Sequence, residues 1–353
     1  MAMTTEIGPL VSILIPCFNA EKWVADAIRS ALAQTYPHKE VILVDDGSTD
    51  RSLEVAKSFG EAVRWETGPN QGASAARNRL LALSRGEWLQ YLDADDCLLP
   101  RKIETHMALV AAVPCDLVVG PWVGDGKDAS TPPPSHDPWT DLLSGLGHLG
   151  NSSENLWRKQ SIVAAGGWDP SVRLGEELEL MFAMLRGGAR VAYCSEPMVT
   201  VRDVNSDSLS HQDPLGAPRI SITHLKHRVA FLQCNGQLNL QRRRAAAMNA
   251  LRIAEALWRA RDTAWTEAES LARTVCPDLA AFLRRETHVY GILYGLFGFR
   301  WARRYLGLTR VARSTISQIR RLLWPRNGPR HAISVCGIGR TGRAPHEHEG
   351  APR

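Results

Sequence analysis

The sequence predicts an α/β fold in which helices flank a doubly wound, mostly parallel sheet, with a helical extension at the C-terminal end. Two observations predict the sheet. Short apolar runs rich in β-branched residues alternate with segments of helical spacing, and turn-forming residues separate them. Strands that alternate with helices pair in parallel. A third observation predicts the extension, because residues 220–323 are helix-dominated, with little glycine or proline before Gly291.

The elements follow one another in a regular order. An apolar run forms the first expected strand, and the helix after it carries its apolar side chains on one face until Tyr36-Pro37 ends it. A later helix is opened by Pro100 at its first turn. The expected strands are residues 10–16, 41–44, 62–65, 88–92 and 116–119. The expected helices before Pro100 are residues 21–34, 52–58 and 73–86.

Three regions are expected along the chain. Residues 1–215 form the α/β domain, which a loop rich in proline, glycine and aspartate at 124–138 interrupts without ending. Residues 216–325 form the helical region. Residues 326–353, rich in glycine, proline, arginine and histidine, are expected to be a disordered basic tail.

The charge of the chain is divided unevenly. The net charge is +5, but residues 300–353 carry twelve arginines, two glutamates and no lysine, so the first 299 residues carry −5. A basic end predicts contact with an anionic surface, either membrane or nucleic acid. Residues 296–323 mix aromatics, leucines and arginines at near-helical spacing. That pattern suits an interfacial helix on anionic lipid, and equally a helix packed on the preceding domain with a solvated arginine face.

Cysteine usage and hydropathy predict the compartment. The seven cysteines are odd in number and form no C-x-x-C pair, which argues against a secreted disulfide framework and a zinc ribbon. The N-terminal segment lacks the features of a signal peptide, and no stretch reaches the ~20 apolar residues of a membrane span. We expect a cytoplasmic protein, which would attach peripherally to the inner face of the cell membrane if residues 296–323 form the interfacial helix.

Acidic residues follow the fourth expected strand. Asp93, Asp95 and Asp96 occupy three of four positions directly after an apolar run. Two carboxylates spaced in this way can hold Mg²⁺ or Mn²⁺ through hard oxygen ligands and so bridge substrate phosphates. The alternative is a solvated loop in which Asp96 caps a helix. Since D-x-D alone is a weak motif, the spacing by itself favours the loop.

Other polar groups lie where strands or loops meet helices. Asp45 ends the second strand, where it can accept hydrogen bonds from a base or ribose, although a tight turn also explains much of this segment. Arg77 and Asn78 project from a helix whose N-terminal end favours phosphate, or whose alanines pack closely on the sheet. Glu176 and Glu177 could supply a general base, but their spacing alone favours an acidic first turn of a helix.

Taken as an ordered set, these segments resemble the family-2 inverting glycosyltransferases with the GT-A fold. The resemblance covers roughly residues 10–210, and it is specific because the pieces occur in a fixed order. The segments are VSILIPCFNAEKWVADAIRSAL, VILVDDGSTDRS, NQGASAARNRLL, GEWLQYLDADD, AAGGWDP and GEELEL.

The resemblance implies a role for each matching residue on the donor side. Asp45 would read the base, Arg77 would lie near the nucleotide, and Asp93 would hold the ribose. Asp95 would be the direct ligand of the metal–diphosphate group, with Mg²⁺ or Mn²⁺ as cofactor. The residues that would line the base are Pro16, Phe18 and Asn19, with Phe18 in place of the usual tyrosine.

The resemblance also implies the acceptor side. Glu177 would be the catalytic base, although the family usually has aspartate there, so the carboxylate must retract by one methylene. Residues expected near the acceptor are Trp168, Asp169, Glu176 and Arg202. Val204 stands where the family often has histidine, so that contact is missing.

The resemblance implies a definite activity. The protein would move a hexosyl or N-acetylhexosaminyl group from a nucleoside-diphosphate sugar to a glycan or lipid-linked acceptor hydroxyl, with inversion, in bacterial surface polysaccharide or glycan synthesis. The alternative is a catalytically inactive nucleotide-sugar-binding protein of the same fold, supported only by the glutamate at 177. A nucleic-acid binder would leave the ordered motifs unexplained, so no nucleic-acid partner is expected.

Overall fold

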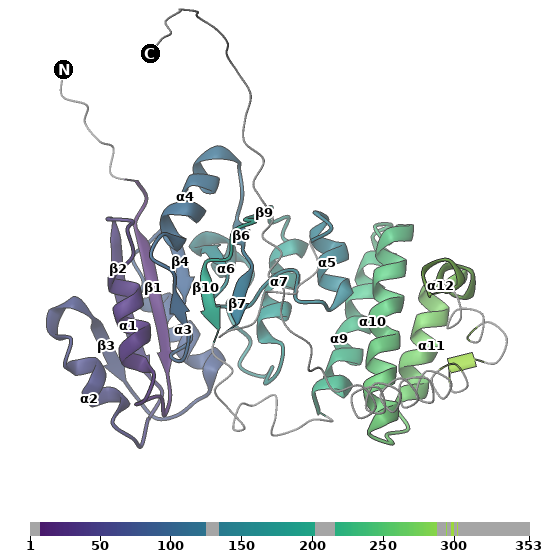
Figure 1. Ribbon diagram of the computed structural model, residues 1–353, viewed down its shortest axis with the longest axis horizontal. Coiled ribbons are helices and arrows are strands. Elements are labelled where there is room, and N and C mark those ends of the chain that lie inside the picture. Colours follow the sequence, from purple (N-terminus) through teal and green to yellow (C-terminus); the bar gives the residue numbers. More distant parts are fainter. Residues whose placement is uncertain are drawn as a thin grey trace, which may run out of the picture.

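The computed structural model describes residues 8–124, 134–201 and 216–287, together with residues 294, 298, 299 and 302. Its centre is a seven-stranded sheet (Figure 1). The strands, in spatial order, are β3 (Arg64–Thr67), β2 (Lys39–Asp45), β1 (Val11–Cys17), β4 (Trp88–Tyr91), β8 (Leu156–Arg158), β6 (Leu117–Val119) and β9 (Val191–Tyr193). All five strands expected up to residue 119 are present, with bounds within two residues of the prediction.

The sheet is mostly parallel, as the sequence predicts. β3, β2, β1 and β4 pair in parallel, and so do β6 and β9. β8 runs antiparallel to both of its neighbours, β4 and β6. The sequence did not reveal this reversal, because a strand of three residues is too short to show a period or a direction.

Helices cover both faces of the sheet, and the first strand explains why. Val11, Ile13 and Ile15 join the core beneath α1, α2 and α4, whereas Leu14 joins the core beneath α3, α6 and α7. Side chains alternate between the faces of a strand, so an apolar run buries both faces. These helices are α1 (Val24–Leu32), α2 (Ser52–Lys57), α3 (Ala73–Leu83), α4 (Lys102–Ala112), α6 (Lys159–Ala164) and α7 (Glu176–Arg186).

Smaller elements complete the α/β region. A three-stranded sheet has the order β5 (Cys97–Leu98), β10 (Val199–Val201) and β7 (Trp122–Gly124). A short 3-10 helix, η1 (Gly60–Ala62), precedes β3. Helix α5 (Pro138–Ser144) is capped at its N-terminus by Asp137, whose carboxylate accepts a hydrogen bond from the backbone N–H of Thr140 at 3.1 Å.

The C-terminal region is helical, as predicted (Figure 1), and its buried apolar side chains form a separate core. The helices are α9 (Gly216–Cys234), α10 (Leu240–Arg259), α11 (Trp265–Val275) and α12 (Leu279–Thr287). Leu143 of α5 belongs to this core, and Arg242 of α10 forms an ion pair with Asp137 at 2.8 Å. The helical region is therefore tied to the α/β region by α5.

Two segments of the basic C-terminal end had predicted roles. The arginine-rich segment 296–323 falls almost wholly outside the described residues, and the tail after it entirely so, so their predicted membrane contact stays a prediction. Within the described residues, no helix combines the length and the apolar character needed to cross a bilayer.

Candidate active site

The loops after β1 and β2 are fastened to each other at the carboxyl edge of the sheet. Asn19 has a left-handed backbone with φ of 49°, and its side-chain Oδ1 accepts a hydrogen bond from the backbone N–H of Thr49 at 2.9 Å. The backbone N–H of Asn19 donates to Ser48 Oγ at 2.9 Å. Asn19 therefore fixes the shape of this edge.

A cavity of about 420 Å³ opens beside this edge. Its lining includes Pro16, Phe18, Asn19 and Asp95, four of the residues that the sequence assigned to the donor site. The Phe18 side chain is 49% exposed, which is unusual for a large apolar ring and suits stacking on a planar ligand. The structure thus brings the expected aromatic ring and the expected metal ligand to one opening.

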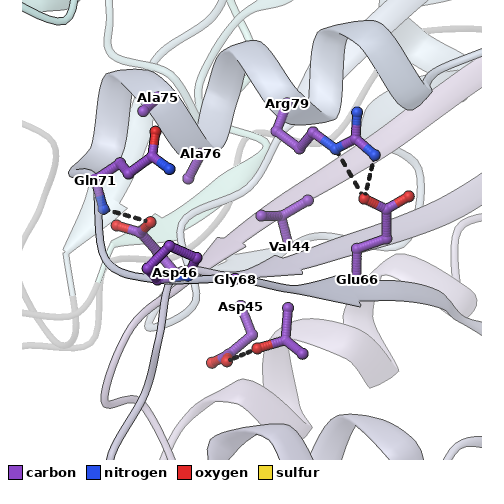
Figure 2. Close-up of a pocket in the computed structure, with 11 residues that line it drawn as sticks. Val44, Asp45, Asp46, Glu66, Gly68, Gln71, Ala75, Ala76 and Arg79 are labelled. Atoms are coloured by element: carbon purple, nitrogen blue, oxygen red, sulfur yellow. Dashed lines mark hydrogen bonds and ion pairs between the residues drawn. The ribbon is translucent and has the colours of Figure 1, made fainter.

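The two aspartates after β2 have separate structural partners. Asp45 is 2% exposed, and its carboxylate accepts hydrogen bonds from Thr67 Oγ1 at 2.7 Å and from the backbone N–H of Ser48 at 3.3 Å. Asp46 points to the other side, where it accepts from the backbone N–H groups of Gln71 and Gly72 at 2.9 and 2.8 Å (Figure 2). The second aspartate of the pair therefore holds the loop that leads into α3.

The turn between these loops requires glycine. Gly47 has φ of +77°, and a Cβ there would lie 2.8 Å from the backbone nitrogen of Asn70. Beside the turn, Asp45, Asp46 and Arg79 take part in lining a smaller cavity of about 210 Å³ (Figure 2). Arg79 forms an ion pair with Glu66 at 2.6 Å along its border.

Arg77 on α3 is the centre of the buried charge cluster. Its guanidinium donates to Glu176 at 2.9 Å and to Asp93 at 3.0 Å, and it lies 3.7 Å from a carboxylate oxygen of Glu177. The Arg77 side chain is 6% exposed, and its planar group lies 4.7 Å from the ring centre of Trp168. Three carboxylates from the β4 end and the α7 start therefore share one buried cation.

The neighbouring Asn78 fastens the turn that carries Trp168. Its side-chain amide donates to the backbone carbonyl of Trp168 at 2.6 Å, and its Oδ1 accepts from the backbone N–H of Trp168 at 2.9 Å. Trp168 is 1% exposed and packs edge-on against Tyr91 at 5.1 Å. Trp168, expected near the acceptor, lies in the interior beneath Arg77.

Glu177 has the environment that a general base requires. Burial raises the pKa of its carboxyl to about 7; Arg77 opposes the rise, and the negative charges of Glu176 and Asp93 add to it. Its side chain is 20% exposed, so part of the residue remains open to solvent. A base with a pKa near the working pH transfers protons most effectively.

The structure also reveals site residues that the sequence did not suggest. Ser152 Oγ donates to the Asp93 carboxylate at 3.1 Å, and Ser153 Oγ accepts the backbone N–H of Asp93 at 3.0 Å. Both serines are fully buried, and so is nearly all of Glu154. The sequence feature that could have indicated these residues is a run of five polar residues, 151–155, directly before the buried pair Leu156-Trp157.

The remaining expected residues are placed as follows. Asp169 is exposed, and its carboxylate accepts from the backbone N–H of Ser171 at 2.8 Å and from its hydroxyl at 2.7 Å, which closes a turn. Arg202 lies outside the described residues. Among the residues that the structure describes, no three histidine, cysteine, aspartate or glutamate side chains form a metal-binding group. Asp95 would therefore need further ligands from substrate and water.

Comparisons with known proteins match part of the chain to a known family. The sequence model of Glycosyl transferase family 2 matches residues 12–165. The chain carries a family-2 glycosyltransferase domain. An uncharacterized glycosyltransferase of Rickettsia typhi is 42% identical to this domain over 103 residues, which cover 29% of this chain and 32% of the relative. Glycosyltransferase GlyG of Streptococcus pneumoniae is 36% identical over 118 residues, 32% of this chain and 39% of the relative.

The match to these relatives is partial, but the fold extends further. The chain spans roughly a third of the length of these two relatives. The crystal structure of S. aureus TarS residues 1–349 has a TM-score of 0.51 at 16% identity, covering 77% of this chain and 91% of that one. The family-2 domain therefore has the GT-A fold that its motif order predicts.

Proposed function

We propose that this protein is an inverting glycosyltransferase that moves a sugar from a nucleoside diphosphate to an acceptor hydroxyl. The observation that carries the proposal is the position of Glu177. Arg77 holds this carboxyl beside Asp93 at the carboxyl edge of the sheet, and its pKa is raised to about 7. TarS structures that hold UDP and UDP-GlcNAc support a nucleotide sugar as the donor class.

In this proposal, some residues bind the sugar donor and others act on the acceptor. On the donor side, the exposed ring of Phe18 stacks on the base, and Asp93 holds the ribose. On the other side, Glu177 takes the proton of the acceptor hydroxyl as that oxygen attacks the anomeric carbon. Attack opposite the leaving diphosphate inverts this carbon in one step, so the enzyme needs no covalent nucleophile.

Arg77 has a positioning role in this scheme. Most of its hydrogen-bonding capacity is directed to Asp93, Glu176 and Ser152, and its Nε is buried without a partner among the described residues. Its charge keeps the base close to the donor-side aspartate and moderates the rise in the Glu177 pKa. We therefore place Arg77 between the two halves of the site, behind the surface that meets the nucleotide.

The carboxylate of Asp95 suits Mg²⁺ or Mn²⁺ bound together with substrate. Asp95 would hold the ion from the edge of the 420 Å³ cavity, and the diphosphate and water would complete its coordination. The metal would supply neutralisation of the charge that develops on the leaving diphosphate. A glycan or lipid-linked acceptor in bacterial surface polysaccharide synthesis fits this chemistry, and the basic region would place the enzyme on an anionic membrane surface.

A thermal-shift screen followed by transfer assays tests the proposal. The purified chain would be heated with nucleoside diphosphates and their sugars, with and without Mn²⁺. Binding raises the unfolding temperature by mass action, so the best ligand names the donor class. Metal-dependent stabilisation followed by transfer with inverted anomeric configuration would support the proposal. Binding without transfer to any acceptor of a glycan panel would favour the inactive nucleotide-sugar-binding protein.

A further inference from the structure

The first turn of α7, which carries the proposed base Glu177, is held by two buried arginines. Arg77 of α3 contacts Glu176 and Glu177 from the α/β region. Arg228 of α9, in the helical region, forms an ion pair with Glu179. Residues two positions apart point to different sides of a helix, so Glu177 and Glu179 face different neighbours. The two regions of the chain therefore meet at the turn that carries the base.

Arg228 is almost wholly enclosed where it meets α7. Its side chain is 5% exposed and that of Glu179 is 18% exposed, and the Nε of Arg228 has no hydrogen-bond partner among the described residues. His224, one turn earlier on α9, places its Nδ1 3.3 Å from the same carboxylate. Burying an ion pair costs free energy, and apolar side chains of similar volume often stabilise a protein as well or better. The pair therefore calls for a role besides stability.

Aromatic rings pack the later turns of α7 against α9. The ring of Phe182 lies edge-on to Phe231 at 5.5 Å and to His227 at 5.3 Å. The guanidinium of Arg186 lies 5.2 Å from the ring centre of Phe231. These contacts belong to the second and third turns of the helix. The ion pair is thus the contact with α9 that lies nearest to Glu177.

We propose that Arg228 is a positioning residue, which fixes the first turn of α7 so that Glu177 is held at the correct distance from Arg77 and from the acceptor. This inference rests on the proposed function. A general base must lie within hydrogen-bond reach of its proton, and misplacement by about 1 Å can lower a rate about 100-fold. The family-2 sequence model ends at residue 165, before α7 and α9. The inference extends the catalytic unit beyond that match into the helical region.

A double variant, Arg228→Met with Glu179→Gln, separates positioning from stability. It removes both charges and leaves no partner of the pair buried alone, so the free energy of unfolding should change little. We expect kcat to fall by about 10- to 100-fold, because the first turn of α7 is no longer fixed. The KM for the donor should stay within about twofold. The reason is that the loops after β1, β2 and β4 line the donor cavity, away from α9.

Two further variants serve as rescue and control. Arg228→Lys keeps a positive charge that can pair with Glu179, so it should retain most of the activity. Arg219→Met is the matched control, because Arg219 lies on the same helix and pairs instead with Asp262, at 2.7 Å. Its kcat should stay within about twofold of the wild type.

The pKa of Glu177 gives a second measurement that needs no turnover. The charge of Arg77 lowers this pKa and opposes the rise that burial causes. A loosened first turn would lie farther from Arg77 on average, so the pKa should rise further above about 7. Carbon-13 NMR of protein labelled at its glutamate carboxyl groups measures the pKa, and Glu177→Gln assigns the signal.

The single variants distinguish positioning from a direct effect of charge. Arg228→Met and Glu179→Gln remove opposite charges. A direct electrostatic effect alone would therefore raise the Glu177 pKa in Arg228→Met and lower it in Glu179→Gln. Release of the first turn should raise it in both, and in the double variant as well. The rising limb of kcat/KM against pH should move to higher pH in the same three proteins.

Either of two results would overturn the inference. One is a double variant whose kcat stays within about twofold of the wild type. The other is a Glu177 pKa that moves in opposite directions in the two single variants, or that does not move when stability is lost. Should the wild type transfer no sugar, the proposed function fails separately, and the NMR titration still decides whether Arg228 positions Glu177.

Discussion

The guanidinium of Arg77 donates to the carboxylate of Glu176 across 2.9 Å, although 99 positions separate the two residues in the chain. The same group donates to Asp93 at 3.0 Å. One buried cation therefore joins α3, the end of β4 and the start of α7. Charged groups that share a buried position depend on one another strongly, because each would be costly to bury alone.

Removing this cation should destabilise the protein. Arg77→Ala leaves three neighbouring carboxylates without their counterion, and we expect a loss of about 3–5 kcal/mol in the free energy of unfolding. Arg79→Ala is the control on the same helix, since its pair with Glu66 is largely exposed and should contribute less than about 1 kcal/mol. Urea unfolding at neutral pH measures both. Equal losses for the two variants would contradict the central role of Arg77.

Replacing the base should separate binding from chemistry. Glu177→Gln removes the proton acceptor while preserving size, so turnover should fall by at least about 100-fold with nucleotide binding unchanged. In the wild type, kcat/KM should rise with pH through about 7, because the carboxyl must be ionised to accept a proton. A variant that retains most of its turnover would assign the base to another residue.

The raised pKa values also predict how stability depends on pH. In the folded state Glu177 and Glu154 have pKa values of about 7 and 8, above the usual 4.5, so the folded protein binds more protons between pH 4.5 and 8. Their contribution is complete below pH 4.5 and is lost as pH rises through 7 to 8. Unfolding temperature should therefore decline from pH 6 to 9, and the double variant Glu154→Gln with Glu177→Gln should flatten that decline. An unchanged slope would argue against the raised values.

Asp95 should control the metal dependence. Asp95→Ala removes the carboxylate that lines the donor cavity, and we expect the stabilisation that Mn²⁺ adds to nucleoside-diphosphate binding to disappear. Asp26→Ala, on the exposed surface of α1, provides a matched aspartate control. Calorimetric titration of the nucleotide with and without Mn²⁺ measures the difference. Retention of the Mn²⁺ effect in Asp95→Ala would assign the metal to other ligands.

Local patterns were sufficient for much of the fold. The apolar runs at 10–16 and 41–44 correspond to β1 and β2, and the helix-dominated stretch after 216 corresponds to α9–α12. These elements are predictable because each carries its own period of apolar residues. The three-residue strand β8 has no such period, so its antiparallel direction follows only from its pairing with β4 and β6.

For the site, the sequence by itself determined the chemical groups and the edge of the sheet at which they gather. Asp93, Asp95 and Glu177 could be named because they occur within an ordered set of motifs. The tertiary structure decided which groups touch. Arg77 meets Glu176 and Trp168 through contacts between residues far apart in the chain. The spacing of residues along the sequence does not reveal such contacts, because the burial and the pKa of a side chain depend on neighbours that only folding brings together.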